Sequence, residues 1–294
     1  MLLALLQTMR PKQWAKNGFL FAALIFDGQL FYPPAVLRTA AGFVLFCLLS
    51  SVVYILNDLT DLEADRQHPK KKLRPLPSGR LPVGVAKVAA AVILVVVLPL
   101  AYFLSVPFAI IAVVYLLVNI AYSAKLKHIP ILDVLVLASL YVLRVGAGVE
   151  LIDVTLFSPW LYLFTIFLAL FLGVGKRRAE LNLLADDANA HRPVLEGYSL
   201  PLLDQLITIV SGITIITYSL YTFSAHNLPA DYTMMLTIPF VIYGVFRYLY
   251  LVQVEKSGGA PEDVLFSDRP LQIAVALWGL AILLIFYVFP KGLF

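Results

Sequence analysis

Long apolar runs dominate this sequence and restrict it to a fold that can reside in a lipid bilayer. The runs lie near 14–31, 37–56, 84–104, 107–123, 130–150, 157–175, 203–225, 232–251 and 271–290. Each has roughly the 17–25 residues that an α-helix needs to cross the hydrocarbon core. Because backbone groups in lipid must satisfy one another, we expect an all-α integral membrane protein with nine transmembrane helices in one bundle.

The composition supports a single membrane domain. Hydrophobic residues make up 61% of the 294 residues and charged residues only 14%, whereas soluble domains carry about 25% charged residues. No soluble domain of ordinary size fits between the runs, so residues 1–294 are predicted to form one polytopic domain. Its longer polar segments are 57–83, 124–129, 176–202 and 252–270. The first and fifth runs are the weakest, because Asp27 and Arg144 interrupt them.

The distribution of basic residues predicts the orientation. If the N-terminus is cytoplasmic, nearly all lysines and arginines fall on that side, and the other side receives only Arg38 and Lys291. Basic loops face the cytoplasm in membrane proteins. We therefore expect a multi-pass protein of the cell (plasma) membrane whose polar segments form one active-site mouth at the cytoplasmic side.

An acidic segment follows directly on the second apolar run. It carries four acids within eight residues, at Asp58, Asp61, Glu63 and Asp65. If the helix continues past Leu56, then Asn57, Asp61 and Asp65 are spaced at i, i+4 and i+8, with Asp58 three residues before Asp61, so all four share one face. Mg²⁺ is the natural cation for such a face, since it binds carboxylates together with substrate phosphates. Glu63 points off this face.

A structural alternative remains open for these acids. They could cap a helix or pair with Lys70, Lys71, Lys72 and Arg74, in the proline-rich stretch that follows. The same cations could hold substrate phosphates over the metal, or they could contact anionic lipid head groups.

Three further groups of residues could bind phosphate. Tyr122, Lys125 and Lys127 end the fourth run, where lysines also serve as snorkelling anchors. Arg144 lies inside the fifth run and needs a polar pocket or a structural partner; Gly146 and Gly148 would let another helix approach it closely. Lys176, Arg177 and Glu180 end the sixth run, where basic residues are also an ordinary topology signal.

An acidic magnesium face and several cationic groups at one mouth suit a substrate with a diphosphate leaving group. The metal and the cations would stabilise the charge that develops on the departing pyrophosphate. Chemistry at the membrane edge suggests that the second substrate is a lipid.

The pattern Asn57-Asp-x-x-Asp61-x-x-x-Asp65 after the second of nine runs resembles the signature of the UbiA-type intramembrane prenyltransferases. Most members carry a second aspartate-rich motif after the sixth span, and here Gly175-Lys-Arg-Arg-Ala-Glu180 replaces it. Together with the acidic segment and this basic motif, four further motifs resemble the decaprenyl-phosphate phosphoribosyltransferase branch: Arg10–Asn17, Tyr122–Lys127, Pro261–Asp263 and Asp268–Pro270.

The resemblance implies a Mg²⁺-dependent transfer of 5-phosphoribosyl from phosphoribosyl pyrophosphate to a polyprenyl (decaprenyl) phosphate, for cell-wall arabinan precursors. Asp58, Asp61 and Asp65 would be catalytic and, with Asn57, would hold the metal. The expected substrate-binding residues are Lys16, Asn17, Asn57, Arg66, Arg74, Tyr122, Lys125, Lys127, Arg144, Lys176, Arg177 and Glu180. Glu180 would orient a ribose hydroxyl or hold Lys176. We expect no nucleic-acid partner, and homo-oligomerisation is left open.

Two alternatives remain. The chain could transfer a prenyl group from its diphosphate to an aromatic acceptor. It could also be a lipid or small-molecule carrier, although a carrier needs polar residues on the outer halves of its spans, and the sequence offers few there beyond Asp27 and Arg38.

Overall fold

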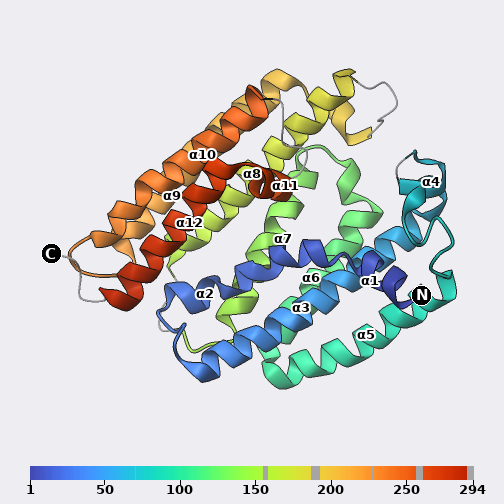
Figure 1. Ribbon diagram of the computed structural model, residues 1–294, viewed down its shortest axis with the longest axis horizontal. Helices are drawn as coiled ribbons and strands as arrows, with labels where there is room; N and C mark the ends of the chain where they lie inside the picture. The colour runs from blue at the N-terminus through green and yellow to red at the C-terminus, as the bar shows by residue number, and fades with distance from the viewer. Residues whose placement is uncertain (70, 155–157, 187–192, 227, 256–260, 290–294) are drawn as a thin grey trace. The chain divides into compact units, whose positions relative to one another are not determined.

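The structure, a computed structural model, describes residues 1–69, 71–154, 158–186, 193–226, 228–255 and 261–289, and all the regular elements in these ranges are helices joined by turns and loops. Figure 1 shows the order of the helices along the chain. The α-helices are α1 (Leu2–Met9), α2 (Phe21–Phe26), α3 (Pro33–Thr60), α4 (Leu62–Gln67), α5 (Val83–Leu104), α6 (Val106–Ala124), α7 (Leu132–Val149), α8 (Pro159–Asp186), α9 (Leu200–Ser224), α10 (Ile238–Gln253), α11 (Pro261–Ser267) and α12 (Arg269–Leu283). Short 3-10 helices lie at Pro11–Leu20, Lys71–Leu73, Leu126–His128, Pro193–Gly197 and Thr233–Thr237, and a π-helix at Leu284–Val288 ends the described chain.

Eight of the nine predicted spans coincide with helices that are long and apolar enough to cross a membrane. Within the described ranges these are Pro33–Thr60, Val83–Leu104, Val106–Ala124, Leu132–Val149, Pro159–Asn182, Leu200–Ser224, Thr233–Gln253 and Arg269–Val288. Hydropathy located them well because each is a continuous apolar segment, although two of them combine α10 with a 3-10 helix and α12 with a π-helix. The all-helical membrane architecture is therefore confirmed.

The first predicted span, 14–31, differs from the prediction because it is not a single long helix. The 3-10 helix Pro11–Leu20 runs into the short helix α2, and a turn at Gly28 with a positive φ of 71° follows. Polar side chains explain the irregular backbone, since several of them bond to α3 rather than face lipid. Trp14 Nε1 donates to Ser51 Oγ at 3.0 Å, and Asn17 Nδ2 donates to Ser50 Oγ at 3.2 Å.

This segment nevertheless runs antiparallel to α3 along much of its length. Residues later in this segment contact residues earlier in α3. The contacts in order are Arg10 with Asp58, Trp14 with Ser51, Asn17 with Ser50 and Cys47, and the ring of Phe21 with that of Phe43 at 5.4 Å. A chain that starts at the C-terminal end of α3 therefore reaches the N-terminal half of the same helix.

The described residues group into two compact units. Unit 1 comprises 1–25, 29–124 and 143–154, and unit 2 comprises 26–28, 125–142 and 155–294. Helix α7 contributes residues to both. The single membrane domain expected from the sequence stays a prediction.

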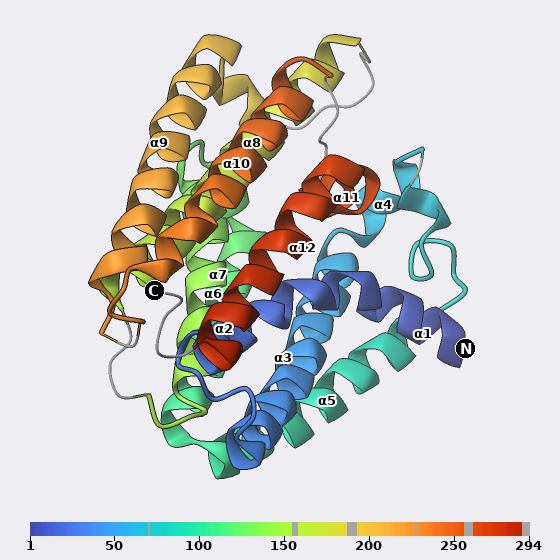
Figure 2. The ribbon, with the colours of Figure 1, turned by 60° about the vertical axis from the view of Figure 1, so that its left-hand side comes forward.

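In unit 1, α3 packs against α1, α5 and α6 (Figure 2). The core between α1, α3 and α5 contains Met9, Val52, Ile55 and Ala86. The polar segment 57–83 joins this core, because Leu76 and Leu81 are almost fully buried there. Its backbone turns back on itself, with Ser78 N donating to Arg74 O and Leu81 N donating to Pro75 O, both at 3.0 Å. The proline-rich stretch is thus compact and tied to the helices.

In unit 2, α8 packs along α9, and α10 packs along α12; Figures 1 and 2 show α8, α9 and α10 running side by side. The core includes Phe171, Leu203 and Tyr248. Gly175 permits the close approach of α8 to α10, since a Cβ at this position would lie 2.7 Å from the Tyr248 ring. The packing therefore requires glycine immediately before the basic motif.

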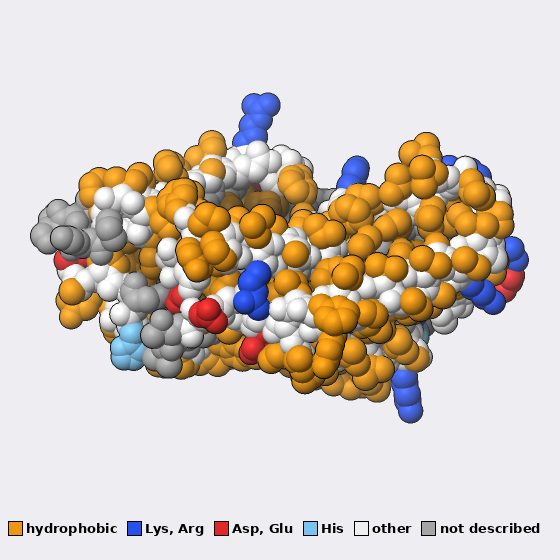
Figure 3. Space-filling view, turned by 90° about the horizontal axis from the view of Figure 1, so that it is seen from below, with side chains coloured by type: hydrophobic (Ala, Val, Ile, Leu, Met, Phe, Trp, Pro, Cys, Tyr) orange, Lys and Arg blue, Asp and Glu red, His pale blue; other side chains and the backbone are white. Residues whose placement is uncertain are grey.

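The surface is mainly apolar. The face in Figure 3 carries hydrophobic side chains over most of its area, with charged groups in small clusters. Large apolar side chains such as Val95, Phe103 and Ile209 project outward from the spans. A soluble monomer rarely exposes large contiguous apolar patches, so these surfaces fit contact with lipid.

Gly148 provides a test of the packing in unit 1. A Cβ there would lie 2.0 Å from the carbonyl oxygen of Leu20, whereas a Cβ at Gly146 would lie 3.9 Å from its nearest neighbour. We expect Gly148→Ala to lower the stability by about 1–3 kcal/mol through overpacking, and Gly146→Ala to be neutral or slightly stabilising because alanine favours helix. Thermal unfolding in detergent measures both, and equal melting temperatures would contradict the close contact between Gly148 and Leu20.

Candidate active site

The acidic segment continues the helix of α3 through one irregular residue. Asp61 N donates to Asn57 O at 2.9 Å, and Asp65 N donates to Asp61 O at 2.8 Å, so the i→i−4 pattern passes through the junction between α3 and α4. As a result Asp58 and Asp65, seven residues apart, lie on one face and are both buried. Asp61 is half-buried. The predicted helical continuation is confirmed.

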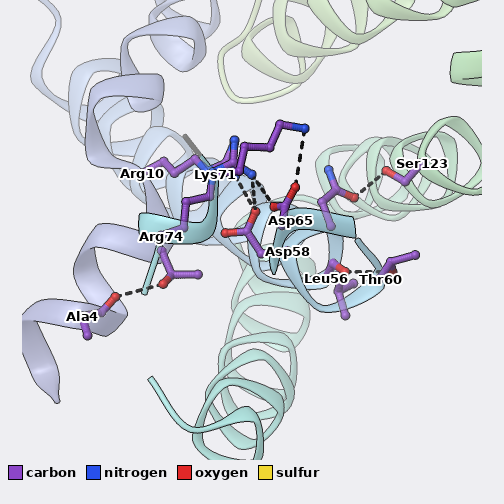
Figure 4. Close-up of polar contacts among 11 residues, drawn as sticks. Ala4, Arg10, Leu56, Asp58, Thr60, Asp65, Lys71, Arg74 and Ser123 are labelled. Carbon is purple, nitrogen blue, oxygen red and sulfur yellow. Dashed lines mark hydrogen bonds and ion pairs between the residues drawn. The ribbon is translucent and has the colours of Figure 1, made fainter. Parts of the chain in front are cut away.

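Three cations surround the two buried carboxylates (Figure 4). Arg74 Nη1 lies between them, 2.7 Å from Asp65 Oδ2 and 3.4 Å from Asp58 Oδ1. Arg10 Nη2 lies 2.5 Å from the same Asp58 oxygen, and Lys71 Nζ lies 3.5 Å from Asp65 Oδ1. We call these five residues the acid–base cluster. Lys71 and Arg74 thus pair with the acids, as the structural alternative expected. Lys70 lies outside the described residues.

Arg10 is held in place by its backbone and by an aromatic ring. It ends α1 in the left-handed conformation, with φ 54° and ψ 63°, and its N–H donates to Gln7 O. Its guanidinium carbon lies 4.8 Å from the centroid of the Tyr54 ring, a cation–π distance. The structure therefore adds Arg10 to the residues expected from the sequence.

Arg74 is positioned by the compact loop. It follows the 3-10 helix Lys71–Leu73, and its N–H donates to Lys71 O at 2.9 Å. The next residues, Pro75 and Leu76, are buried against the core of unit 1. This anchoring fixes the backbone from which the guanidinium reaches both carboxylates.

The neighbouring residues occupy several environments. Asn57 Oδ1 accepts a hydrogen bond from Ser123 Oγ at 2.5 Å, which ties the acidic segment to the last turn of α6. Tyr122, next to this serine, is half-buried. Arg66 bonds to Glu63 at the surface, 2.7 Å away. Lys125 is exposed and Lys127 is half-buried, and both belong to unit 2.

Arg144 lies in a second buried polar group of unit 1. Its Nε donates to Asn17 Oδ1 and its Nη2 to Tyr115 OH, each at 2.9 Å. Asn17 is fully buried and donates in turn to α3. Gly148, one turn along α7, allows this approach to the 3-10 helix, whereas Gly146 makes only an ordinary contact. Lys16 is half-buried on the same 3-10 helix. The structure brings together Asn17 and Arg144 and gives this buried arginine partners within the protein.

In unit 2, Arg177 is buried in a network of protein groups. Its Nε donates to Asp133 Oδ2 and its Nη1 to Glu180 Oε2, each at 2.6 Å. Tyr198 donates its hydroxyl proton to Asp133 Oδ1 at 2.6 Å and accepts from the N–H of Ile131, which has an unfavourable φ of 69°. Burial and the bond to Asp133 raise the pKa of Tyr198. The phenol is therefore a stable proton donor at neutral pH.

This network gives Arg177 a structural environment. The guanidinium is fully buried between Asp133 and Glu180 and ties α8 to the start of α7. The charge that was expected to bind substrate is therefore paired with two acids of the protein. Glu180 is half-buried and contacts Arg177, while Lys176 is half-buried on the same helix. Of this motif, Lys176, Arg178 and Glu180 keep partly accessible side chains, and Arg178 is paired with Asp204.

The last motif has a capping role in the part that is described. Asp268 accepts from Leu271 N at 2.8 Å at the start of α12, and it binds Arg247 Nη2 at 2.7 Å. The arginine and the helix N–H hold the pKa of Asp268 below its usual value. The side chains of Pro261, Glu262 and Asp263 lie outside the described residues.

Comparison with known proteins identifies the family. A model described as the UbiA prenyltransferase family matches residues 18–267. The chain belongs to the UbiA prenyltransferase family. The fold agrees: a solved UbiA homolog from Archaeoglobus fulgidus, bound to GPP and Mg²⁺, has a TM-score of 0.70 at 20% identity, covering 96% of this chain and 99% of that one.

Relatives with higher identity are also found. This UbiA chain is 33% identical over 298 residues to a decaprenyl-phosphate phosphoribosyltransferase of Corynebacterium glutamicum, which covers 97% of this chain and 87% of that protein. A decaprenyl-phosphate phosphoribosyltransferase of Mycobacterium tuberculosis is 34% identical over 277 residues, 92% of this chain and 90% of that protein. The recognition of this branch from the sequence motifs is confirmed.

Tyr198 offers a test of the buried network in this UbiA protein. Tyr198→Phe would remove the hydroxyl that bonds to the Ile131 N–H and to one oxygen of Asp133. We therefore expect the free energy of unfolding to fall by about 1–3 kcal/mol. Tyr243→Phe, at a tyrosine that is 48% exposed in unit 2, is the matched control and should be neutral. Unfolding followed by tyrosine and tryptophan fluorescence in detergent compares the two, and an unchanged stability of Tyr198→Phe would rule out the structural role.

Proposed function

We propose that this protein transfers the 5-phosphoribosyl group of phosphoribosyl pyrophosphate to a polyprenyl phosphate, with Mg²⁺, and releases pyrophosphate. The observation that carries the proposal is the likeness, at 33% identity over 97% of the chain, to a protein named decaprenyl-phosphate phosphoribosyltransferase. The replacement of the second acidic motif by Gly175–Glu180 fits the same reading, because one acidic motif suits a single metal–diphosphate.

The acid–base cluster, together with the neighbouring Asn57 and Asp61, is suited to a metal that arrives with a diphosphate. Asp58, Asp61, Asp65 and Asn57 supply the oxygen ligands that Mg²⁺ prefers. Among the described residues, no group of three or more His, Cys, Asp or Glu side chains is placed to hold a metal ion by itself. Mg²⁺ commonly takes one or two carboxylates and completes its shell with water and phosphate, so this donor set fits it. When bound, the metal would neutralise charge on the diphosphate.

The chemistry requires few protein groups. An oxygen of the lipid phosphate forms a bond to C1 of the ribose, the bond from C1 to the diphosphate oxygen breaks, and the electron pair leaves with pyrophosphate. A phosphate monoester is largely ionised at neutral pH, since its second pKa is about 6, so a strong general base is not needed. Arg10, Lys71 and Arg74 would stabilise the leaving group electrostatically.

The 5-phosphate of the ribose and the phosphate of the lipid need cations as well. Arg144 and Lys16 in unit 1, and Lys125, Lys127 and Lys176 in unit 2, are the candidates that the sequence supplies, with Arg66 and Tyr122 beside the acidic segment. Arg177 contributes by holding the α8 segment, and Glu180, partly accessible beside it, would meet a ribose hydroxyl. Hydrogen bonds between such cations and phosphate are among the stronger polar contacts in proteins.

Asp61 provides the decisive variant. It is half-buried, so Asp61→Asn should fold while losing an acidic ligand, and we expect transfer to fall about 100-fold or more. Glu63→Gln removes the same charge two residues away, at an exposed side chain paired with Arg66, and should keep its activity. The assay measures label from phosphoribosyl pyrophosphate in the lipid fraction of purified protein with Mg²⁺ and polyprenyl phosphate, with and without a chelator.

Two results would refute the proposal. Activity of the wild type on a prenyl diphosphate and an aromatic acid, with no phosphoribosyl transfer, would return the chain to the ordinary prenyltransferases. Full activity of Asp61→Asn would contradict the assignment of the acidic segment as the metal site.

We further propose nine membrane crossings with the N-terminus, the acidic segment and the other polar segments at the cytoplasmic face of the cell membrane, in one domain. The antiparallel run of Pro11–Phe26 beside α3 supports the ninth crossing. Ten 3-10 residues and six α-helical residues extend over about 29 Å at rises of about 2.0 and 1.5 Å, close to the thickness of the hydrocarbon core. The concentration of basic residues supports the orientation.

Single cysteines test this topology, because Cys47 is the one cysteine in the sequence. In a Cys47→Ala background, an impermeant maleimide should label Phe31→Cys in intact spheroplasts. Lys12→Cys and Ser78→Cys should react only after the membrane is opened. Labelling of Lys12→Cys together with Phe31→Cys in intact spheroplasts would instead mean that the first segment does not cross.

A further inference from the structure

The acid–base cluster holds more positive than negative charge. Asp58 and Asp65 supply two negative charges, and Arg10, Lys71 and Arg74 supply three positive ones within 2.5–3.5 Å of their oxygens. A buried carboxylate is destabilising unless a cation accompanies it. In the structure, these cations provide that compensation.

The cations lie on the accessible side of the carboxylates. The side chains of Asp58 and Asp65 are 3% and 2% exposed, whereas those of Arg10, Arg74 and Lys71 are 29%, 35% and 43% exposed. A ligand that approaches from solvent therefore meets the cations first. The excess positive charge of the five residues favours the approach of an anion over that of a free divalent cation.

Arg74 occupies the position where a shared cation is needed. Its Nη1 contacts one oxygen of each carboxylate, and Arg10 contacts the same Asp58 oxygen. A metal ion that takes these oxygens of the two acids must displace the nitrogen atoms that contact them. The displaced guanidinium groups then need another anion within reach, because they remain tethered to α1 and to the compact loop.

We propose that Arg10, Lys71 and Arg74 are exchangeable counter-ions that occupy Asp58 and Asp65 until a metal–diphosphate enters, and then bind the diphosphate. This inference rests on the proposed function, and it goes beyond it by specifying that metal and diphosphate bind cooperatively. The metal alone binds weakly, since it competes with three cations. The diphosphate alone finds cations that are already paired. When both are present, the metal binds the two acids and the diphosphate binds the three cations that the metal has displaced. Each ligand therefore raises the affinity for the other, and this coupling is reciprocal.

Arg10 is the residue that separates this device from ordinary structural pairing. Its charge reaches the cluster from α1, outside the acidic segment and its loop, so it can be removed without altering the segment that carries the acids. If Arg10 is an exchangeable counter-ion, removing its charge should make Asp58 easier for a metal to reach. If the pair is only structural, removing Arg10 should not improve metal binding.

The test measures Mn²⁺, which accepts the same oxygen ligands as Mg²⁺, bound to the full-length protein in detergent by equilibrium dialysis. Inorganic pyrophosphate should lower the dissociation constant of Mn²⁺ for the wild type by about tenfold. Arg10→Gln should bind Mn²⁺ alone several-fold more tightly than the wild type, and pyrophosphate should help it less. Arg10→Lys keeps the charge and should remain close to the wild type.

Arg80→Gln is the matched control, because Arg80 lies in the same unit and bonds to Ser78, Gln7 and the Leu73 carbonyl rather than to the acids. It removes the same charge and should behave as the wild type. Lys71→Gln, at the most exposed of the three cations, provides a second variant should Arg10→Gln fold poorly. A melting curve in detergent establishes that each variant is folded.

The outcomes separate this inference from the proposed function. If folded Arg10→Gln and Lys71→Gln bind Mn²⁺ alone no better than the wild type, or if pyrophosphate has no effect on the wild type, the counter-ion exchange is wrong even where phosphoribosyl transfer is observed. If the coupling and its loss in Arg10→Gln are observed but no phosphoribosyl group is transferred, the exchange stands and the assigned substrates are wrong.

Discussion

The pairing of buried carboxylates with arginine is the interaction on which both units depend. In unit 1, Asp58 and Asp65 are compensated by Arg10 and Arg74, and in unit 2, Asp133 is compensated by Arg177. Removing one partner from such a pair leaves a charge without compensation, which is far more costly than losing a surface ion pair. The pairs therefore constrain the helices that carry them: α1 and the proline-rich loop are fixed to the end of α3, and α8 is fixed to the start of α7.

The two pairings differ in what they leave accessible. In unit 1 the acids are buried and their cations are partly open to solvent, so the charges can be rearranged by an incoming anion. In unit 2 both Asp133 and Arg177 are closed off, and Tyr198 adds a further bond to the carboxylate. The first arrangement is suited to ligand exchange, while the second is suited to holding backbone in place. The strained φ of Ile131 beside Tyr198 is consistent with the second role, since a β-branched residue adopts it only when its surroundings impose it.

The sequence predicted most of the fold because its strongest signals are local. Eight apolar runs became eight span-length helices, and the helical period placed Asp58 and Asp65 on one face. The first span was harder, since hydropathy does not report whether a segment is α-helical or 3-10. Its irregular backbone depends on side chains such as Trp14 and Asn17, whose partners on α3 lie more than thirty residues away in sequence.

The residues of the two buried networks that the sequence missed share one property. Arg10, Asp133 and Tyr198 are separated from their partners by 48, 44 and 65 residues, so no local spacing marks them. Arg10 lies in a motif shared with the family branch, and that resemblance was the signal that could have assigned it to the site. Arg177 shows the converse case, in which a residue that the sequence did mark has buried partners that the sequence did not reveal. Three consecutive cations at the end of a span suggested a phosphate-binding group, but the middle one is turned inward by an aspartate on another helix. A basic motif in the sequence therefore does not show by itself which of its cations can bind a ligand, because some of them pair with buried acids of the fold.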